Sequence, residues 1–129
     1  MKEENTYRQT IPSSTTGRYT ALTRKAMRIC YAAHEGQMDK SGVPYVFHPI
    51  HLAEQMETEE EICTALLHDV VEDTKWTLKE LEAEGFPTGV LEAVRLLTRE
   101  KDVPYMAYIE RLSGNQIARK VKLADLEHN

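Results

Sequence analysis

The chain has 129 residues and a formal net charge of −5 at pH 7, with 16 Lys and Arg against 21 Asp and Glu. This length is typical of one domain with one core, and it leaves no room for a second catalytic domain of ordinary size. The acidic balance and the lack of a basic run argue against a general nucleic-acid-binding protein.

Residues 1–17 are polar and end in the turn-forming run PSSTTG. We expect them to be a flexible lead-in to a single domain at residues 18–129. The lead-in lacks the apolar stretch of a secretory signal, and no later segment approaches the roughly 18 apolar residues that a membrane span needs. These observations predict a cytoplasmic protein that does not bind membranes.

The first predicted helix runs from Arg18 to about Gly36, because apolar residues recur there at helical spacing and the glycine favours a helix end. Cys30 lies in this helix, and Cys63 lies in a later one. The two cysteines form no Cys-x-x-Cys pair and sit in apolar surroundings, so we expect both to be reduced core residues.

Residues 37–47 are expected to form a loop, because they contain the turn-forming sequence DKSG followed by a proline. The loop leads directly to His48, which precedes a proline suited to the first turn of a helix. His48 is therefore expected at a helix N-terminus, with its imidazole free to bind. Most such loops only connect elements, but Lys40 and Ser41 would form the wall of a site at His48.

The most informative segment is CTALLHDVVEDT, residues 63–74. We expect it to lie in one helix that begins at a capping box of Thr58 and Glu61 and ends near residue 73. Helical spacing places four polar residues on one face, opposite an apolar face: His68, Asp69, Glu72 and Asp73. An ordinary amphipathic helix explains this segment as well as metal chemistry does when it is taken alone.

The remaining chain shows helix signals and no sustained period-two pattern. A second capping box, Thr77 with Glu80, begins one of these helices. The expected helices run from Pro49 to about Met56, Thr77 to about Glu84, Pro87 to Leu97, Pro104 to Ser113, and from Asn115 toward the end. The predicted fold class is all-α, as a single helical bundle.

Two further ligand-type residues favour metal chemistry, His48 and Asp125. Asp125 has apolar neighbours in VKLAD and is expected to be partly buried, so its carboxylate needs a partner. Together with His68 and Asp69 these residues offer two imidazoles and two carboxylates. This donor set suits manganese, iron, zinc or nickel rather than calcium, and predicts a divalent transition metal as cofactor.

Four strings of the sequence, in their order and spacing, resemble the HD superfamily of metal-dependent phosphohydrolases. The resemblance is strongest to the hydrolase domain of RelA/SpoT-type enzymes, which degrade (p)ppGpp. The strings are AHEGQ (33–37), KSGVPYVFHPI (40–50), ALLHDVVEDT (65–74) and VKLADLEHN (121–129). The resemblance implies an HD-domain fold and removal of the 3′-pyrophosphate from guanosine 3′,5′-bis(diphosphate).

The resemblance also implies roles for individual residues. The metal ligands would be His48, His68, Asp69 and Asp125, typically for manganese in this family. Glu72 and Asp73 would orient and deprotonate the attacking water. Lys40, Ser41 and Asn129 match positions that contact the nucleotide.

Four neighbouring residues have simpler expected roles. His34, in AHEGQ, is expected to be a structural residue at a helix end rather than a ligand. His51 and His128 are expected to face solvent. Lys122, one turn before Asp125, could reach a phosphate, but a solvated helix face is the safer expectation.

Two departures from the family pattern concern the substrate. Asp39 stands where relatives usually carry a basic residue that can stack on guanine, and a carboxylate there would repel a polyphosphate. The sequence stops at Asn129, where relatives continue into further nucleotide contacts. The alternatives are therefore a phosphohydrolase of another phosphorylated nucleotide, or a non-catalytic metal-bound nucleotide sensor. A sensor has no use for the water-activating pair Glu72 and Asp73. No pattern indicates an oligomeric state.

Overall fold

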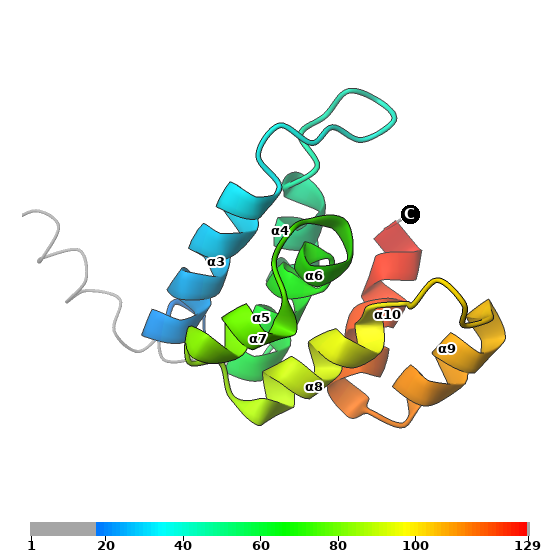
Figure 1. Cartoon of the computed structure of the whole chain (residues 1–129). Helices are drawn as coiled ribbons and strands as arrows, with labels where there is room; N and C mark the ends of the chain where they lie inside the picture. The colour runs from blue at the N-terminus through cyan, green and yellow to red at the C-terminus, as the bar shows by residue number, and fades with distance from the viewer. Residues whose placement is uncertain (1–17, 129) are drawn as a thin grey trace, which may run out of the picture.

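The computed structural model describes residues 18–128, so the expected lead-in and Asn129 lie outside it. Within these residues the chain is all-α, as predicted, and no strand forms beyond an isolated bridge between Met38 and Pro44 (Figure 1). None of the described helices is long and apolar enough to cross a membrane. The helices are α3 (Ala21–Ala33), α4 (Phe47–Glu54), α5 (Glu59–Leu67), α6 (Val70–Asp73), α7 (Leu78–Ala83), α8 (Thr88–Leu97), α9 (Tyr105–Ser113) and α10 (Gln116–His128).

Capping side chains begin several helices close to the predicted positions. The capping boxes of Thr58 with Glu61 and of Thr77 with Glu80 both form, and they start α5 and α7. The side-chain oxygen of Asn115 accepts a hydrogen bond from the backbone N–H of Ala118 at 2.9 Å, at the start of α10. Local sequence therefore determines where these helices enter the bundle.

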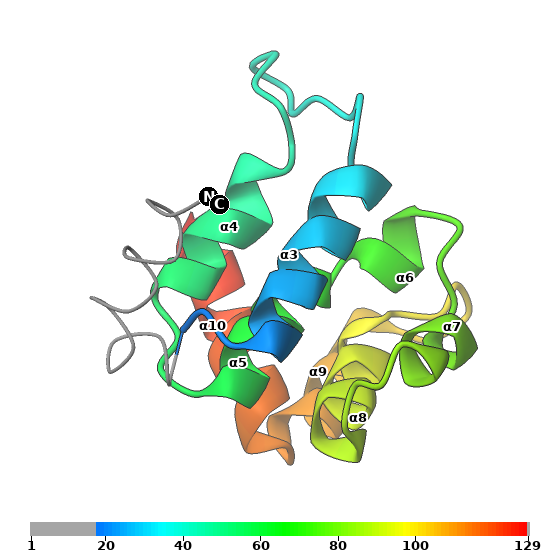
Figure 2. The same ribbon diagram turned by 90° about the vertical axis from the view of Figure 1, so that its left-hand side faces the viewer.

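Helix α5 forms the centre of the bundle and packs against α3, α4, α8 and α10 (Figures 1 and 2). Its sequence from Ile62 to Leu67 is almost wholly apolar, and all six of these residues are buried. A helix that is apolar on all sides is stable only inside a core. Each fully buried leucine, such as Leu66, stabilises the fold by roughly 1.5–3 kcal/mol.

The expected continuous helix through residues 68–73 is wrong. Helix α5 ends at Leu67, and α6 begins only at Val70. The Nδ1 atom of His68 lies 2.7 Å from the carbonyl oxygen of Ala65, a contact that competes with the backbone hydrogen bond of a continuing helix. Asp69 has φ −105° and ψ −2°, outside the regular helical range. His68 and Asp69 therefore form a junction between two helices.

Other boundaries differ by a few residues. Helix α3 ends at Ala33, one turn before Gly36, which adopts φ +85° in the following turn. Helix α4 begins at Phe47, so Pro49 is its third residue rather than its first. The predicted core positions of Cys30 and Cys63 are confirmed: both thiols are free and buried, and burial raises the pKa of each to about 12.

Candidate metal centre and its two cavities

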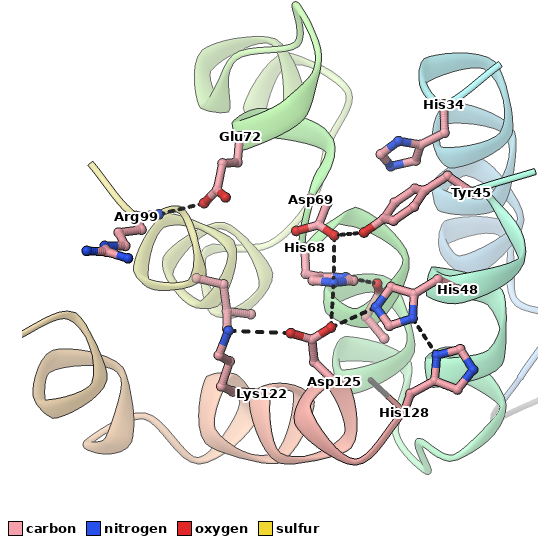
Figure 3. A network of polar contacts seen from close by, with 12 residues as sticks. His34, Tyr45, His48, His68, Asp69, Glu72, Arg99, Lys122, Asp125 and His128 are labelled. Carbon is pink, nitrogen blue, oxygen red and sulfur yellow. Dashed lines mark hydrogen bonds and ion pairs between the residues drawn. The ribbon is translucent and has the colours of Figure 1, made fainter. Parts of the chain in front are cut away.

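Side chains from three separate helical segments meet at one point (Figure 3). His48 comes from the first turn of α4, His68 from the α5–α6 junction, and Asp125 from the last turn of α10. The Oδ1 atom of Asp125 lies 2.7 Å from His48 Nε2 and 3.7 Å from His68 Nε2. One potential donor atom from each residue lies within 4.8 Å of the other two, which is close enough for a shared ion.

The fourth predicted ligand, Asp69, adjoins this group. Its Oδ2 atom lies 3.1 Å from His68 Nε2 and accepts a hydrogen bond from the hydroxyl of Tyr45. The structure thus brings together all four residues that the sequence singled out. Tyr45 was missed, although it lies in the PYVFHP string three residues before His48, a spacing that puts two side chains near each other at a helix start.

The electrostatics of the cluster fit a cation at its centre. His68 Nε2 is buried and has ion-pair contacts with Asp69 and Asp125 at 3.1 and 3.7 Å, but it makes no hydrogen bond of regular geometry within residues 18–128, whereas most buried polar atoms do. Burial lowers the pKa of His68, but its contacts with Asp125 and Asp69 outweigh burial and raise the pKa to about 10. Burial raises the pKa of Asp125, but His48 and His68 hold that pKa well below its ordinary value. Two ionised carboxylates beside two imidazoles suit a divalent transition metal.

Glu72 and Asp73 follow the cluster on α6 but face different surroundings. Glu72 lines a pocket of about 160 Å³ together with His68, Asp69 and Asp125. Its Oε1 atom accepts a hydrogen bond from the backbone N–H of Arg99 at 2.8 Å, which fixes the carboxylate on the pocket wall (Figure 3).

Asp73 is exposed and does not line this pocket. Partial burial, together with the carboxylates of Asp69 and Glu72, raises the pKa of Asp73. The backbone oxygen of Asp73 accepts a hydrogen bond from Gln37 at 3.4 Å, which places this end of α6 beside the loop after α3.

A second, larger groove of about 1050 Å³ shares no lining residue with the pocket. Its walls are the loop between α3 and α4, the start of α4, and the end of α10. Lys40 and Ser41 line this groove together with His48, as expected of a wall beside the site. The metal cluster joins the two cavities, because His48 on the groove contacts Asp125 on the pocket.

Asp39 has a structural role that the sequence analysis did not anticipate. Its Oδ1 atom accepts hydrogen bonds from the backbone N–H groups of Ser41 and Val43, at 2.8 and 3.0 Å. Gly42 adopts φ +81°, which a side chain would strain. The carboxylate therefore organises the loop through an Asx turn, for which the D-K-S-G sequence is a recognisable signal.

The solvent-facing positions expected of His128 and His51 need qualification, and the position expected of Lys122 needs correction. His128 is exposed, but its ring stacks on His48 at 4.8 Å, and the Nδ1 atoms of the two rings lie 2.6 Å apart. His51 is also exposed, and its ring lies 4.3 Å from that of His128. The solvated position expected of Lys122 is wrong, since only 17% of its side chain is exposed and it lines the small pocket. His34 forms the C-cap of α3, as expected of a helix-end residue.

The sequence matches the HD domain family over residues 26–125, a range that contains all four clustered residues. The chain belongs to the HD domain family. The HD domain implies a divalent metal, and His48, His68 and Asp125 form a group that could hold one.

Relatives of this HD domain include the guanosine-3′,5′-bis(diphosphate) 3′-pyrophosphohydrolase MESH1 of Danio rerio. It is 36% identical over 124 residues, which cover 85% of this chain and 68% of the relative. The bifunctional (p)ppGpp synthase/hydrolase SpoT of Escherichia coli K12 is 35% identical over 121 residues, which cover 82% of this chain and 17% of SpoT. The chain thus spans less than a fifth of the length of the SpoT relative.

A solved structure supports the same fold assignment. It belongs to a metazoan ortholog of SpoT that hydrolyzes ppGpp. The two chains superpose with a TM-score of 0.70 at 28% identity, over 82% of this chain and 66% of the other. The predicted HD-domain helical bundle is confirmed.

Proposed function

We propose that this HD domain is a metal-dependent pyrophosphohydrolase of (p)ppGpp, which removes the 3′-pyrophosphate. The observation that carries the proposal is the convergence of two imidazoles and two carboxylates beside a pocket that Glu72 lines. The activities for which the relatives MESH1 and SpoT are named support the choice of substrate. We infer manganese as the first candidate metal.

The four clustered residues, His48, His68, Asp69 and Asp125, would hold the ion. When bound, a divalent ion neutralises phosphate charge and polarises the phosphoryl group under attack. Tyr45 keeps the Asp69 carboxylate oriented toward the cluster through its hydroxyl hydrogen bond. Lys40, Ser41 and Asn129 would contact the nucleotide, the first two from the wall of the large groove.

Glu72 would accept the proton of the attacking water. One of its carboxylate oxygens is fixed by the N–H of Arg99, which leaves the other oxygen to accept a proton from a water in the pocket. Asp73 was expected to share this task, but it does not line the pocket, so we assign the proton acceptance to Glu72 alone. In the reaction the water oxygen bonds to the phosphorus attached to ribose O3′, the bond from phosphorus to O3′ breaks, and O3′ ends as a hydroxyl.

A phosphohydrolase of another phosphorylated nucleotide is the second candidate. The loop before α4 carries Asp39 in place of a basic residue, so it offers no cation at that position to stack on guanine. A non-catalytic sensor agrees less well with the structure, because Glu72 is held on the wall of the same pocket as the metal cluster.

The decisive experiment combines metal analysis with a substrate panel. Purified protein is loaded with manganese and assayed for phosphate and pyrophosphate release from ppGpp, GTP, ATP and nucleoside monophosphates, with His68→Asn as the inactive control. We expect about one bound ion and pyrophosphate release from ppGpp. Release from a different nucleotide alone would favour the second candidate, and ion binding without any release would favour the sensor.

A further inference from the structure

The two cavities beside the metal cluster differ in size and in lining, and the proposed function does not by itself assign them. We propose that the small pocket binds the pyrophosphate group of the substrate, with Lys122 as its phosphate-binding residue, while the large groove holds the nucleoside. This inference rests on the proposed function, since it divides one substrate between the two cavities.

The volumes of the two cavities suit different parts of the substrate. Small organic ligands of nucleoside size occupy pockets of roughly 300–1,000 Å³. The groove of about 1050 Å³ can accommodate such a ligand, whereas the pocket of about 160 Å³ cannot. The pocket therefore has room only for a compact group. A phosphoryl chain fits that description, and a purine with its ribose does not.

Lys122 is positioned as a ligand-binding cation rather than as a solvated one. Its Nζ atom lies 3.4 Å from Asp125 Oδ2 and 5.4 Å from the centre of the Tyr108 ring. The Tyr108 hydroxyl donates to the carbonyl oxygen of Leu97 at 2.9 Å, which fixes the ring. Within residues 18–128, Asp125 is the one acceptor for an ammonium that has three donors. The other donors are available to an anion in the pocket.

Arg99 supplies a second cation to the same wall. Its guanidinium lies 5.4 Å from the centre of the Tyr105 ring, and its Nε atom donates to the carbonyl oxygen of Val103 at 3.1 Å. The two terminal nitrogens remain for a phosphate, which matches the fork of an arginine. The three carboxylates on the pocket lining would oppose a polyanion, so we expect it to bind only when a divalent ion is present.

The division of the substrate also gives a consistent direction of attack. In-line displacement places the attacking and leaving oxygens on opposite sides of the phosphorus. With the nucleoside in the groove, O3′ lies on the His48 side of the cluster, and the attacking water lies on the Glu72 side. The water proton passes to Glu72, the new bond forms to phosphorus, and O3′ leaves and is protonated from solvent.

The test measures binding of two probes to the full chain by calorimetry, with free manganese held constant by a metal buffer. Inorganic pyrophosphate reports on the pocket, and GDP, which lacks the 3′-pyrophosphate, reports on the groove. We expect Lys122→Gln to weaken pyrophosphate binding about tenfold, as for a lost hydrogen bond to a charged group, and to leave GDP binding unchanged. We expect Lys40→Gln to do the reverse.

Lys120→Gln is the matched control, because it removes the same charge from the same helix. The Lys120 ammonium pairs instead with Glu61 of α5 at 3.0 Å, away from the pocket, so both affinities should be unchanged. Lys122→Arg keeps the positive charge and should retain pyrophosphate binding. If Lys122→Gln also loses manganese, Arg99→Gln replaces it, with the same expected loss of pyrophosphate binding alone.

Unchanged pyrophosphate affinity in both Lys122→Gln and Arg99→Gln would overturn the assignment. So would equal losses of pyrophosphate and GDP. Failure of the proposed function has a different signature: pyrophosphate binding that depends on Lys122 in a protein that does not hydrolyse ppGpp. Hydrolysis of ppGpp with pyrophosphate binding independent of both cations would reject the pocket assignment alone.

Discussion

Glu72 is fixed on the pocket wall by the backbone N–H of Arg99 rather than by a cation, so its carboxylate is not neutralised by that contact. We predict that Glu72→Gln keeps its metal and lowers the rate of ppGpp hydrolysis by about 10² to 10⁴, the usual effect of removing a general base. Single-turnover kinetics together with metal analysis would measure both quantities.

The control for this substitution is Glu92→Gln, which makes the same chemical change on the surface of α8, where Glu92 pairs with Arg95 at 2.6 Å. Its rate should equal that of the unmodified protein. A Glu72→Gln enzyme of full activity would show that Asp73, or no side chain at all, accepts the proton.

Asp39 leads to a second prediction, which separates the effect of loop order from the effect of charge. Asparagine keeps the acceptor oxygen for the N–H groups of Ser41 and Val43, and alanine does not. We expect Asp39→Ala to raise the KM for ppGpp several-fold, since each lost hydrogen bond costs about 1 kcal/mol, and Asp39→Asn to leave KM nearly unchanged. A fall in KM for both variants would show that repulsion by the carboxylate, and not the loop, limits binding.

The site residues differ in how far the sequence could predict them. His48, His68, Asp69 and Asp125 were identified because their donor types and motifs are local properties of the chain. The solvated position favoured for Lys122 was wrong, because its burial depends on Tyr108 from another helix and on the carboxylate of Asp125. The sequence pattern of α10 does not indicate where the Tyr108 ring of α9 lies.

At the scale of single helices, the two capping boxes allow a matched comparison. Glu61 at the start of α5 has an ion pair with Lys120 at 3.0 Å, whereas Glu80 at the start of α7 accepts hydrogen bonds only from Thr77 within the described residues. Partial burial raises the pKa of Glu61, but hydrogen bonds from the Glu57 backbone and from Lys120 outweigh burial and lower the pKa.

A carboxyl group whose pKa is lower in the folded chain than in the unfolded chain stabilises the fold above its ordinary pKa. This stabilisation is lost as the pH falls through the lowered value. We predict that Glu61→Gln reduces the free energy of unfolding by about 0.5–1 kcal/mol at pH 7, and that the difference shrinks as the pH falls below 4.5. Urea unfolding of Glu61→Gln and Glu80→Gln from pH 7 to pH 3 tests this prediction. A loss of stability in Glu61→Gln that is equal at pH 7 and pH 3 would contradict it.

The start of most helices could be predicted because capping residues act within three positions of each other. The interruption after Leu67 could not be predicted, because the segment has good helical periodicity on both faces. It arises when the His68 ring contacts the carbonyl of Ala65 while its other nitrogen faces Asp125. Local preference was overruled by the geometry of the site.

At the scale of the whole molecule, the cluster connects α4, the α5–α6 junction and α10. A bound divalent ion would offset the negative charge of its carboxylates. We predict that manganese at about 100 times its Kd stabilises the fold by about 2.7 kcal/mol, because the unfolded chain has no such site. The melting temperature should therefore rise by several degrees. Calorimetric scans with and without manganese measure the shift.

Asp69→Asn should abolish most of this shift, because it removes the charge of one proposed ligand, while Lys120→Gln should keep it. An equal shift in Asp69→Asn and in the unmodified chain would remove Asp69 from the ligand set. The all-α architecture itself was predictable, since an apolar helix such as α5 requires a surrounding layer of helices. The packing partners of α5 were not, because they depend on contacts between distant parts of the chain.

The 77 residues that separate His48 from Asp125 have a consequence for biosynthesis. During translation, residues 48 and 68 emerge long before residue 125, and until then the early histidines lack the carboxylate that joins them. The proposed ion would also need α10 packed against α4 and α5, because that packing brings Asp125 to the cluster. At the proposed metal site, insertion of the ion would therefore follow synthesis and folding of α10, and a ribosome stalled before residue 125 would carry a chain that lacks one of the four proposed ligands.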